Sequence, residues 1–300
     1  MQLLPVLQGY AMIAVYLQGG LGNQMFQYAF AAQVAARHSS RVVIDPYWFD
    51  HSLPSETPRT LDITQLQVEC DVADAATMRR WKMMRLRFAR RLPSFLLPQS
   101  LVMERGNGVD QVALAAPNNS YLRGFWQSEQ YFQDIAISLA AQFVPKAAPS
   151  SQDHALLERM AGGHAVSLHV RRGDYVSLAS AAAYHGTCSP AYYRQAIDHI
   201  LQRREGCRFF VFSDDPRWAA ENLDIAAETH YVSHNGAADA VQDMRLMSRC
   251  QDHIIANSSF SWWGAWLAEQ RHGEGIIIAP RQWLAGRDAI DIVPARWMRM

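Results

Sequence analysis

Hydrophobic and polar positions alternate in short blocks along the second half of the chain. Runs of β-branched and aliphatic residues predict strands, and the amphipathic stretches between them predict helices. The expected strands are 165–170, 207–212, 228–232, 253–256 and 275–279, and the expected helices are 190–204, 216–222, 239–250 and 260–270. Strands that alternate with helices in this way indicate a parallel, doubly wound α/β sheet.

The first half has a less regular pattern. Residues 46–60 are rich in proline and polar side chains and are expected to form a loop, and VPKAAPSS at 144–151 has the composition of a linker. The expected strands are 12–17, 41–45, 100–104 and 120–124, and the expected helices lie near 23–38, 73–91 and 128–143. We expect a chain of 300 residues with this linker to form two domains, 1–150 and 151–300.

A basic loop, HVRRGDY at 169–175, directly follows one of the expected strands. Ligands of open α/β sheets bind at the carboxyl ends of the strands. Arginine presents a planar fork of donors that matches phosphate oxygens, so Arg171 and Arg172 favour a diphosphate site here. The alternative is a solvated loop that holds one surface ion pair.

A glycine-rich loop follows the expected strand 12–17. Gly19, Gly20 and Gly22 allow the backbone to approach a ligand closely. The pattern is not the dinucleotide fingerprint, because the third glycine and the later acidic residue are missing at their usual spacing. By itself the glycine loop is therefore weak evidence for a ligand site. Together with the arginine loop at 169–175 it is stronger evidence.

A third loop, with Asn257, Ser258 and Ser259, follows the expected strand 253–256 and begins a helix. Asparagine and serine are common helix caps, and the same amide groups can hold an anion. The tryptophans of the helix that follows are expected to lie in the core.

Together these stretches resemble the bacterial α-1,2-fucosyltransferases, glycosyltransferase family 11. The resemblance implies a GT-B-like fold, in which two Rossmann-like α/β domains face a cleft. Residues 1–150 would form the acceptor-side domain and residues 151–300 the domain that binds GDP-fucose. The matching segments run in the order of the family over nearly the whole chain: GGLGNQMFQYAF, GFWQSEQYF at 124–132, HVRRGDY, FVFSDD at 210–215 and IIANSSFSWWGAWL at 254–267.

The resemblance also implies the reaction. L-fucose would pass, with inversion, from GDP-β-L-fucose to the 2-hydroxyl of a terminal galactoside in a surface glycan. GDP-fucose and a galactose-terminated oligosaccharide would be the substrates. Because an arginine would carry the leaving charge, we expect no metal and no cofactor. Asp214 and Asp215 could suggest a metal site, but SDDP before a helix is more typical of a cap.

The roles of single residues follow from the same resemblance. Arg171 is the first candidate for the diphosphate contact, with Asp174 and His169 as the other catalytic candidates. Arg172 either assists or pairs with Asp174. Asp243 would accept hydrogen bonds from guanine, or it is only an acid at a helix start. The full set expected at the donor is Gly22, Asn23, His169, Arg171, Arg172, Asp243, Ser258 and Ser259.

The general base and the acceptor side are less defined. Related α-1,6 enzymes carry an acid near the position of Ala179, so the proton acceptor stays open among Asp174, Asp45 and His185. Asp45, Trp48 and Trp126 are the acceptor-side candidates, since sugar rings stack on aromatic side chains. Both tryptophans fit a core position equally well.

Composition narrows the class of protein. The chain has 28 basic and 28 acidic residues, which does not fit a general nucleic-acid binder. The four cysteines have no paired spacing, which argues against a zinc knuckle or a disulfide framework and favours a reducing compartment. No run reaches the roughly 18 apolar residues of a spanning helix, and residues 1–11 lack the features of a signal peptide. We therefore expect a cytoplasmic bacterial enzyme.

The stretch RRWKMMRLRFARR, from Arg79 to Arg91, is a local basic exception. Trp81, Met84, Phe88 and Leu92 fall near one helical face with basic residues around it. Such a helix can lie on the inner face of the cytoplasmic membrane. The alternative is a solvated amphipathic helix packed on its own domain.

Two other functions stay open from the sequence. One is transfer of a different sugar from another sugar nucleotide, which a comparison of donors would separate. The other is a non-catalytic carbohydrate-binding protein, which would bind a glycan without GDP.

Overall fold

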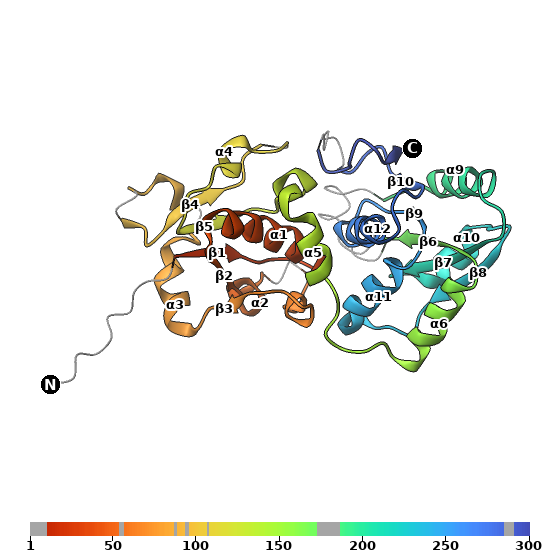
Figure 1. The fold of residues 1–300 in the computed structure, drawn as a ribbon, viewed down its shortest axis with the longest axis horizontal. Coiled ribbons are helices and arrows are strands. Elements are labelled where there is room, and N and C mark those ends of the chain that lie inside the picture. The colour runs from red at the N-terminus through yellow and green to blue at the C-terminus, as the bar shows by residue number, and fades with distance from the viewer. Residues whose placement is uncertain are drawn as a thin grey trace.

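The computed structural model describes residues 11–53, 57–86, 89–93, 96–106, 108–172, 187–284 and 291–300. These residues form two α/β domains that lie side by side, with the N-terminal domain on the left of Figure 1 and the C-terminal domain on the right. Each domain is built on one parallel sheet, and helices cover both sheets. The strand order is β3-β2-β1-β5-β4 in the first sheet and β11-β10-β9-β6-β7-β8 in the second.

The strands of the first sheet are β1 (Met12–Tyr16), β2 (Arg41–Asp45), β3 (Asp71–Val72), β4 (Ser100–Met103) and β5 (Ser120–Arg123). Those of the second are β6 (His164–Val170), β7 (Cys207–Ser213), β8 (Glu228–Val232), β9 (Asp252–Ile254), β10 (Ile277–Ala279) and β11 (Met298–Arg299). Every pair of neighbouring strands runs parallel. The expected alternation of strands and helices in the second half is confirmed.

The helices of the first domain are α1 (Leu21–His38), α2 (Tyr47–His51), α3 (Ala75–Arg80), α4 (Gln111–Leu114) and α5 (Ala136–Gln142). Those of the second are α6 (Ser151–Ala161), α9 (Pro190–Leu201), α10 (Pro216–Asn222), α11 (Ala240–Met247) and α12 (Ser259–His272). Helix α6 was not predicted. Its start has a reciprocal capping box, in which Ser150 and Asp153 each accept from the other's backbone N–H.

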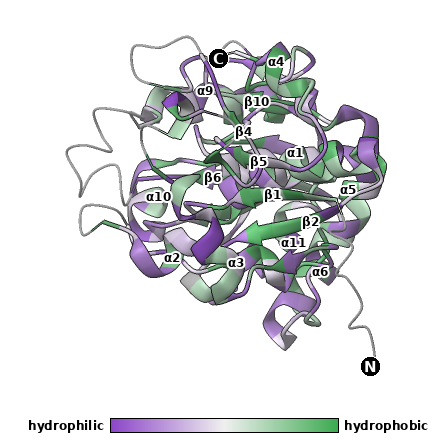
Figure 2. Cartoon of the chain, turned by 90° about the vertical axis from the view of Figure 1, so that its left-hand side faces the viewer, coloured by the Kyte–Doolittle hydropathy of each residue, from purple (hydrophilic) through white to green (hydrophobic). Residues whose placement is uncertain are grey.

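The two domains share one hydrophobic core. Helix α1 is buried on nearly all sides, and its Phe26 lies 4.6 Å from Trp262 and 4.8 Å from Trp263 of α12, between ring centroids. Phe132 of the first domain stacks on Trp263 at 5.1 Å. Figure 2 shows the hydrophobic strands β1 and β2 inside, with more polar segments around them. The tryptophans of α12 therefore lie in the core, as expected.

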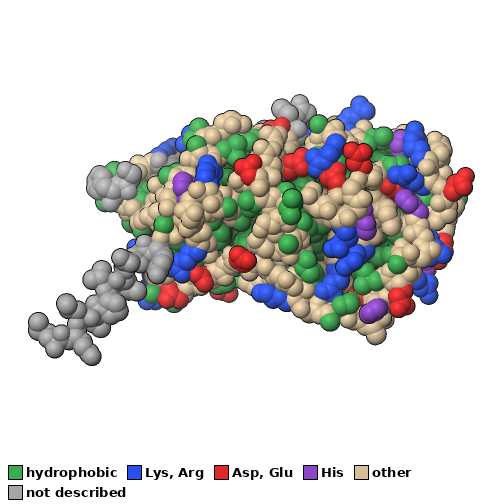
Figure 3. Space-filling model, viewed as in Figure 1, with side chains coloured by type: hydrophobic (Ala, Val, Ile, Leu, Met, Phe, Trp, Pro, Cys, Tyr) green, Lys and Arg blue, Asp and Glu red, His purple; other side chains and the backbone are tan. Residues whose placement is uncertain are grey.

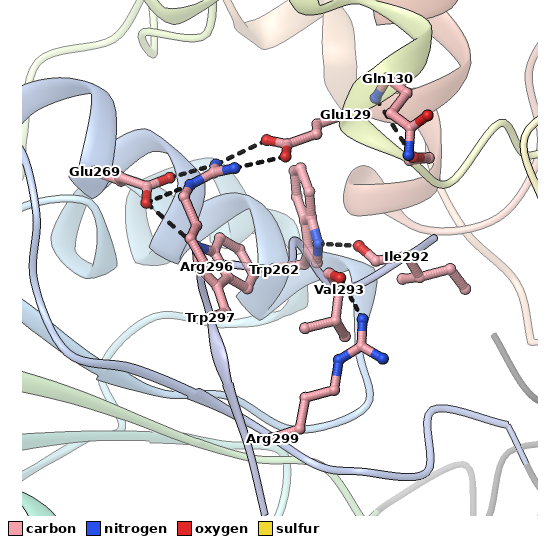
Figure 4. A network of polar contacts seen from close by, with 10 residues as sticks. Glu129, Gln130, Trp262, Glu269, Ile292, Val293, Arg296, Trp297 and Arg299 are labelled. Carbon is pink, nitrogen blue, oxygen red and sulfur yellow. Dashed lines mark hydrogen bonds and ion pairs between the residues drawn. The ribbon is translucent and has the colours of Figure 1, made fainter. Parts of the chain in front are cut away.

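An ion-pair network also joins the domains (Figure 4). Arg296 binds Glu129 of the first domain through two nitrogens at 2.6 and 2.7 Å, and Glu269 of α12 through two at 2.7 and 2.6 Å. Bidentate arginine pairs are geometrically specific. Beside them, Trp262 donates its indole N–H to the carbonyl of Ile292 at 2.7 Å. The C-terminal segment therefore ties α12 to the first domain.

The basic stretch from Arg79 to Arg91 does not form the single amphipathic helix that we expected there. Helix α3 ends at Arg80, a 3₁₀ turn follows (Trp81–Met83), and Phe88 lies outside the described residues. Trp81 and Met84 are buried at 2% and 0% exposure. Trp81 and Met84 thus pack on their own domain, whereas Met83 is 38% exposed.

The surface carries charges of both signs, interspersed over the face in Figure 3. Among the described residues, none of the helices is both long enough and apolar enough to cross a membrane. The four cysteines are free thiols in the structure.

Candidate active site

The first turns of α1 and α12 touch at Gly22. A Cβ on Gly22 would lie 2.5 Å from the backbone nitrogen of Phe260, so only glycine fits this contact. The indole N–H of Trp263 donates to the Gly22 carbonyl at 3.0 Å, and the Ser259 hydroxyl donates to Asn23 Oδ1 at 2.8 Å. The structure therefore brings together Gly22, Asn23 and Ser259 from the two domains.

Neither of these helix starts is neutralised by a side chain. The cap residues, Gly20 and Ser258, make no side-chain cap bond, and no acidic residue stands in either first turn. Each helix start carries about half a positive elementary charge on its free N–H groups. Two such starts in contact form a suitable place for an anion.

Arg171 stands at the carboxyl end of β6, the strand next to β9, which leads to α12. Arg171 Nη1 lies 3.0 Å from Asp214 Oδ2, and the backbone N–H of Arg172 donates to Asp214 Oδ1 at 2.8 Å. Asp214 thus holds both the guanidinium and the loop backbone. This fixes a fork of donors at the sheet edge from which α12 also starts.

Arg172 is turned toward α10 instead. Its guanidinium lies 3.9 Å above the Trp218 ring, and its Nε lies 3.8 Å from Asp215. Asp215 also accepts from the Trp218 backbone N–H at 3.1 Å, so the expected helix cap is confirmed. The alternative partner that we expected for Arg172, Asp174, lies outside the described residues. The contacts of Arg172 given above are with residues near α10.

His169 is buried at the end of β6, with its ring 5.8 Å from that of Phe260 at the start of α12. Burial, and then the charge of Arg171, lowers the pKa of His169 to about 3, so the imidazole is neutral. Within the described part of the chain, its buried Nδ1 has no hydrogen-bond partner. Buried polar atoms are almost always paired in proteins, which makes this nitrogen a candidate for a ligand contact.

Asp243 belongs to a polar network at the start of α11. The Asn235 amide donates to Asp243 Oδ1 at 2.7 Å and to Asp153 Oδ1 at 3.1 Å, and His234 Nε2 lies 2.9 Å from the same Asp153 oxygen. Burial raises the pKa of Asp243 to about 6, although the bond from Asn235 lowers it. One oxygen of Asp243 is therefore held and the carboxylate is poorly solvated.

The acceptor-side candidates are placed differently from one another. Asp45 is fully buried and accepts from Arg85 at 2.5 Å and from the Tyr121 hydroxyl at 2.6 Å, which gives it a structural role. Trp126 is also fully buried, whereas its neighbour Phe125 is 40% exposed. Trp48 is only partly buried, at the start of α2.

Two expected groups lie outside the described residues, namely Asp174 and His185. Sequence reasoning missed the roles of Asp214, Asn235 and Gln127, whose amide donates to Asn23 at 2.8 Å. Asp214 follows the strand β7, and only the pairing of β7 with β6 brings it to the arginine loop. Within the described residues, His, Cys, Asp and Glu side chains form no group of three that could hold a metal ion.

Solved structures support the fold. A mutant of Arabidopsis thaliana FUT1 in complex with GDP matches with a TM-score of 0.55 and 11% identity, over 95% of this chain and 75% of that one. The fucosyltransferase NodZ of Bradyrhizobium matches with a TM-score of 0.50 and 14% identity, over 86% and 92%. The two parallel-sheet α/β domains therefore have the GT-B fold of these enzymes.

Sequence comparison gives the family. Residues 91–298 match the model of glycosyl transferase family 11. The α-1,2-colitosyltransferase of Escherichia coli is 31% identical over 97% of this chain and 99% of that protein, and the O-antigen biosynthesis glycosyltransferase WbnK of Escherichia coli is 31% identical over 95% and 99%. The galactoside α-(1,2)-fucosyltransferase 1 of Plecturocebus brunneus is 24% identical over 85% of this chain and 64% of that protein. The chain belongs to glycosyltransferase family 11.

Proposed function

We propose that the protein is an inverting α-1,2-fucosyltransferase that uses GDP-β-L-fucose and a terminal galactoside. The observation that carries this proposal is the contact between the uncapped starts of α1 and α12. The guanidinium of Arg171, which Asp214 holds at the end of β6, adds to it, because β6 is the neighbour of β9, the strand that leads to α12. A diphosphate suits this arrangement of donors. The names of the relatives, which include a galactoside α-1,2-fucosyltransferase and a GDP complex, support the choice of sugar and nucleotide.

In the proposed step, the galactose 2-hydroxyl attacks the anomeric carbon of fucose from the side opposite GDP. The carbon–oxygen bond to the diphosphate breaks, and its electron pair leaves with GDP. Arg171, Ser258, Ser259 and the first-turn N–H groups of both helices stabilise that negative charge, which is the largest expected contribution. The hydroxyl proton passes to a base, for which Asp174 and His185 are the remaining candidates.

Incubation with GDP-fucose and lactose tests the proposal. We expect a product in which fucose is α-linked to O2 of galactose, as read from NMR couplings and correlations across the new linkage. GDP-mannose and UDP-sugars are the comparison donors. No transfer from GDP-fucose, together with transfer from one of these donors, would assign a different reaction.

A second candidate is transfer of colitose, which the relative with 31% identity favours. Colitose is L-fucose without its 3-hydroxyl group, so the two donors place the same groups at the anomeric carbon and diphosphate. Competition between the two sugar nucleotides at equal concentration gives the preference directly. A site that hydrogen-bonds the 3-hydroxyl rejects the deoxy sugar strongly, because its polar groups stay unpaired.

We propose that the transfer needs no divalent cation. The support is that an arginine and two helix starts face the position of the diphosphate, while Asp214 is engaged by Arg171 and Asp215 caps α10. We expect full activity in excess EDTA. Complete loss that Mg²⁺ or Mn²⁺ restores would show that a metal carries the leaving charge.

Asp243 is proposed to accept hydrogen bonds from the guanine edge, with His169 as a second base contact. Asp243→Asn replaces an accepting oxygen with a donor, so GDP affinity is expected to fall about 10- to 100-fold. The free energy of unfolding of the ligand-free variant, by contrast, should stay the same or rise. Because the pKa of Asp243 is raised to about 6 in the folded state, folding binds a proton between about pH 4 and 6, and unfolding becomes easier as pH rises through that window.

At pH 7.5 the Asn variant should therefore melt at the same or a higher temperature while binding GDP more weakly. GDP affinity of the unmodified protein should fall as pH drops below about 6, because the carboxylate protonates. The groups that face Asp243 are Asn235, His234, Asp153 and Asp239. Asp239→Asn, on the same helix start, is the control that should keep its affinity. Calorimetry that shows unchanged GDP binding by Asp243→Asn would reduce Asp243 to a helix-start acid.

Any contact with an anionic membrane is proposed to act through charge alone. Arg79, Arg80 and Lys82 are exposed, whereas Trp81 and Met84 are buried. We expect weak sedimentation with anionic vesicles at low salt that disappears at about 0.15 M salt, where the screening length is about 8 Å. Binding that resists salt would contradict a purely electrostatic contact.

A further inference from the structure

The turn after β5 presents one aromatic ring at the edge where the two domains meet. Phe125 is 40% exposed, while the next residue, Trp126, is fully buried. Strand β5 pairs with β1 in parallel, and β1 leads to the loop of Gly22 and Asn23. Figure 1 shows β1 running toward the C-terminal domain, so this edge faces the proposed donor site.

The backbone of this turn is strained and held in place. Trp126 has a φ of 55°, in the left-handed region that bulky residues avoid. Its ring packs in the core at 4.5 Å from Phe30 and 5.5 Å from Tyr131. Such a conformation persists only where the surroundings impose it, and strain of this kind gathers at functional sites.

A partly buried carboxylate fixes the same turn from the other side. Glu104 accepts from the backbone N–H of Phe125 at 2.7 Å and from that of Trp126 at 2.9 Å. Burial raises the pKa of Glu104, although these two bonds lower it. A Cβ on Gly124 would lie 2.4 Å from Glu104 Cβ, so no larger residue fits there. The backbone of the turn is therefore anchored on both sides of Phe125, whose side chain is 40% exposed.

The turn is also connected to the proposed diphosphate site. The Gln127 amide donates to Asn23 Oδ1, the oxygen that also accepts from the Ser259 hydroxyl, both at 2.8 Å. Two residues of chain span at most about 7 Å. Phe125 therefore lies within reach of a sugar that is bound beside the reacting carbon.

We propose that Phe125 is the platform on which the acceptor sugar packs. The ring has no polar group, so it suits the C–H face of a pyranose. In a galactoside the C–H bonds at positions 3, 4 and 5 form such a face and leave the 2-hydroxyl free. This inference rests on the proposed function and names the acceptor subsite of the same site, where sequence reasoning had placed Trp126.

The test separates the two substrates of the reaction. Phe125→Ala should raise the KM for lactose about five- to tenfold, the size of one lost aromatic contact. The KM for GDP-fucose and the slow hydrolysis of GDP-fucose without acceptor should stay unchanged. Phe125→Trp should restore most of the lactose affinity. Ile137→Ala is the control, since this side chain of the same domain is 86% exposed on α5.

Glu104→Gln tests the anchoring. One oxygen becomes an amide donor that opposes a backbone N–H, so the KM for lactose should rise while GDP binding stays the same. An unchanged lactose KM in Phe125→Ala, or an equal rise in both KM values, overturns the proposal. If the unmodified protein neither binds GDP nor transfers fucose, the proposed function itself is wrong. This outcome differs from the two above, which contradict only the role of Phe125.

Discussion

Arg171→Ala should lower fucosyl transfer at least about 10- to 100-fold while the protein stays folded. The side chain is the fixed fork at the carboxyl end of β6, where it lies 3.0 Å from Asp214 and follows the neutral His169. Hydrogen bonds to a charged group contribute about 1.5–3 kcal/mol, which corresponds to that loss in rate. Arg171→Lys should recover only part of the activity, because an ammonium lacks the planar pair of donors.

Arg208→Ala is the matched control for this variant. Arg208 stands at the amino end of β7 in the same sheet and pairs with Glu228 at 3.0 Å on the surface. Its loss should leave turnover unchanged. Steady-state kinetics of both variants, with circular dichroism to show that they fold, give the comparison. Normal turnover by a folded Arg171→Ala protein would remove this residue from the reaction.

Gly22→Ala should damage both stability and activity. The added methyl would meet backbone atoms of α12, with Phe260 N and Ser259 C each 2.5 Å away, and backbone cannot move aside as a flexible side chain can. Overpacking of this kind costs about 1–3 kcal/mol. For a chain of this size we expect a melting temperature lower by roughly 2–5 °C. Turnover should fall more than tenfold, because Asn23 and Ser259 would separate.

Gly20→Ala provides the contrast, two residues earlier in the same loop. A Cβ there has open space, with Arg59 Nε at 3.9 Å as its nearest neighbour. This variant should melt within about 1 °C of the unmodified protein and stay active. If Gly22→Ala behaves like Gly20→Ala in calorimetry and kinetics, the close contact of α1 and α12 is not required for the reaction.

Much of the second domain could be predicted, because most of its elements carry a local signal, although α6 and β11 were not expected. Helix α10 begins and ends as expected, since Asp215 caps it and Pro216 opens it. The strand β8 also has its expected bounds. By contrast, β3 is a two-residue strand with exposed side chains, and no hydrophobic run marks it.

The segment after α3 shows why local pattern fails elsewhere. Its charges and apolar residues fit one long helix, yet the chain turns after Arg80. Arg85 makes a buried pair with Asp45, and its guanidinium lies 4.1 Å above the Tyr47 ring. Asp45 is 40 residues away from Arg85 in the sequence, so no local sequence pattern contains this pair.

The site shows the same division. Arg171 and Ser259 could be predicted because each follows a recognisable strand. The pairing of Arg171 with Asp214 depends on β6 and β7 being neighbours, with Val170 opposite Ser213, and strand order is not visible in a single sequence. Likewise, the sequence left Trp126 open between an acceptor-side and a core position, and only the structure shows that it is fully buried.

The shared core between α1 and α12, with Arg296 joining Glu129 and Glu269, has a consequence for engineering. An enzyme whose domains are separate modules can be recombined by exchanging its halves. Here a crossover at the linker would separate Phe26 from Trp262 and Trp263, and would pair foreign surfaces across the most densely aromatic part of the protein. Chimeras with relatives should therefore be cut so that α1, α12 and the C-terminal segment come from the same parent. Acceptor preference is better changed by exchanging surface turns while α1, α12 and the C-terminal segment are kept from one parent.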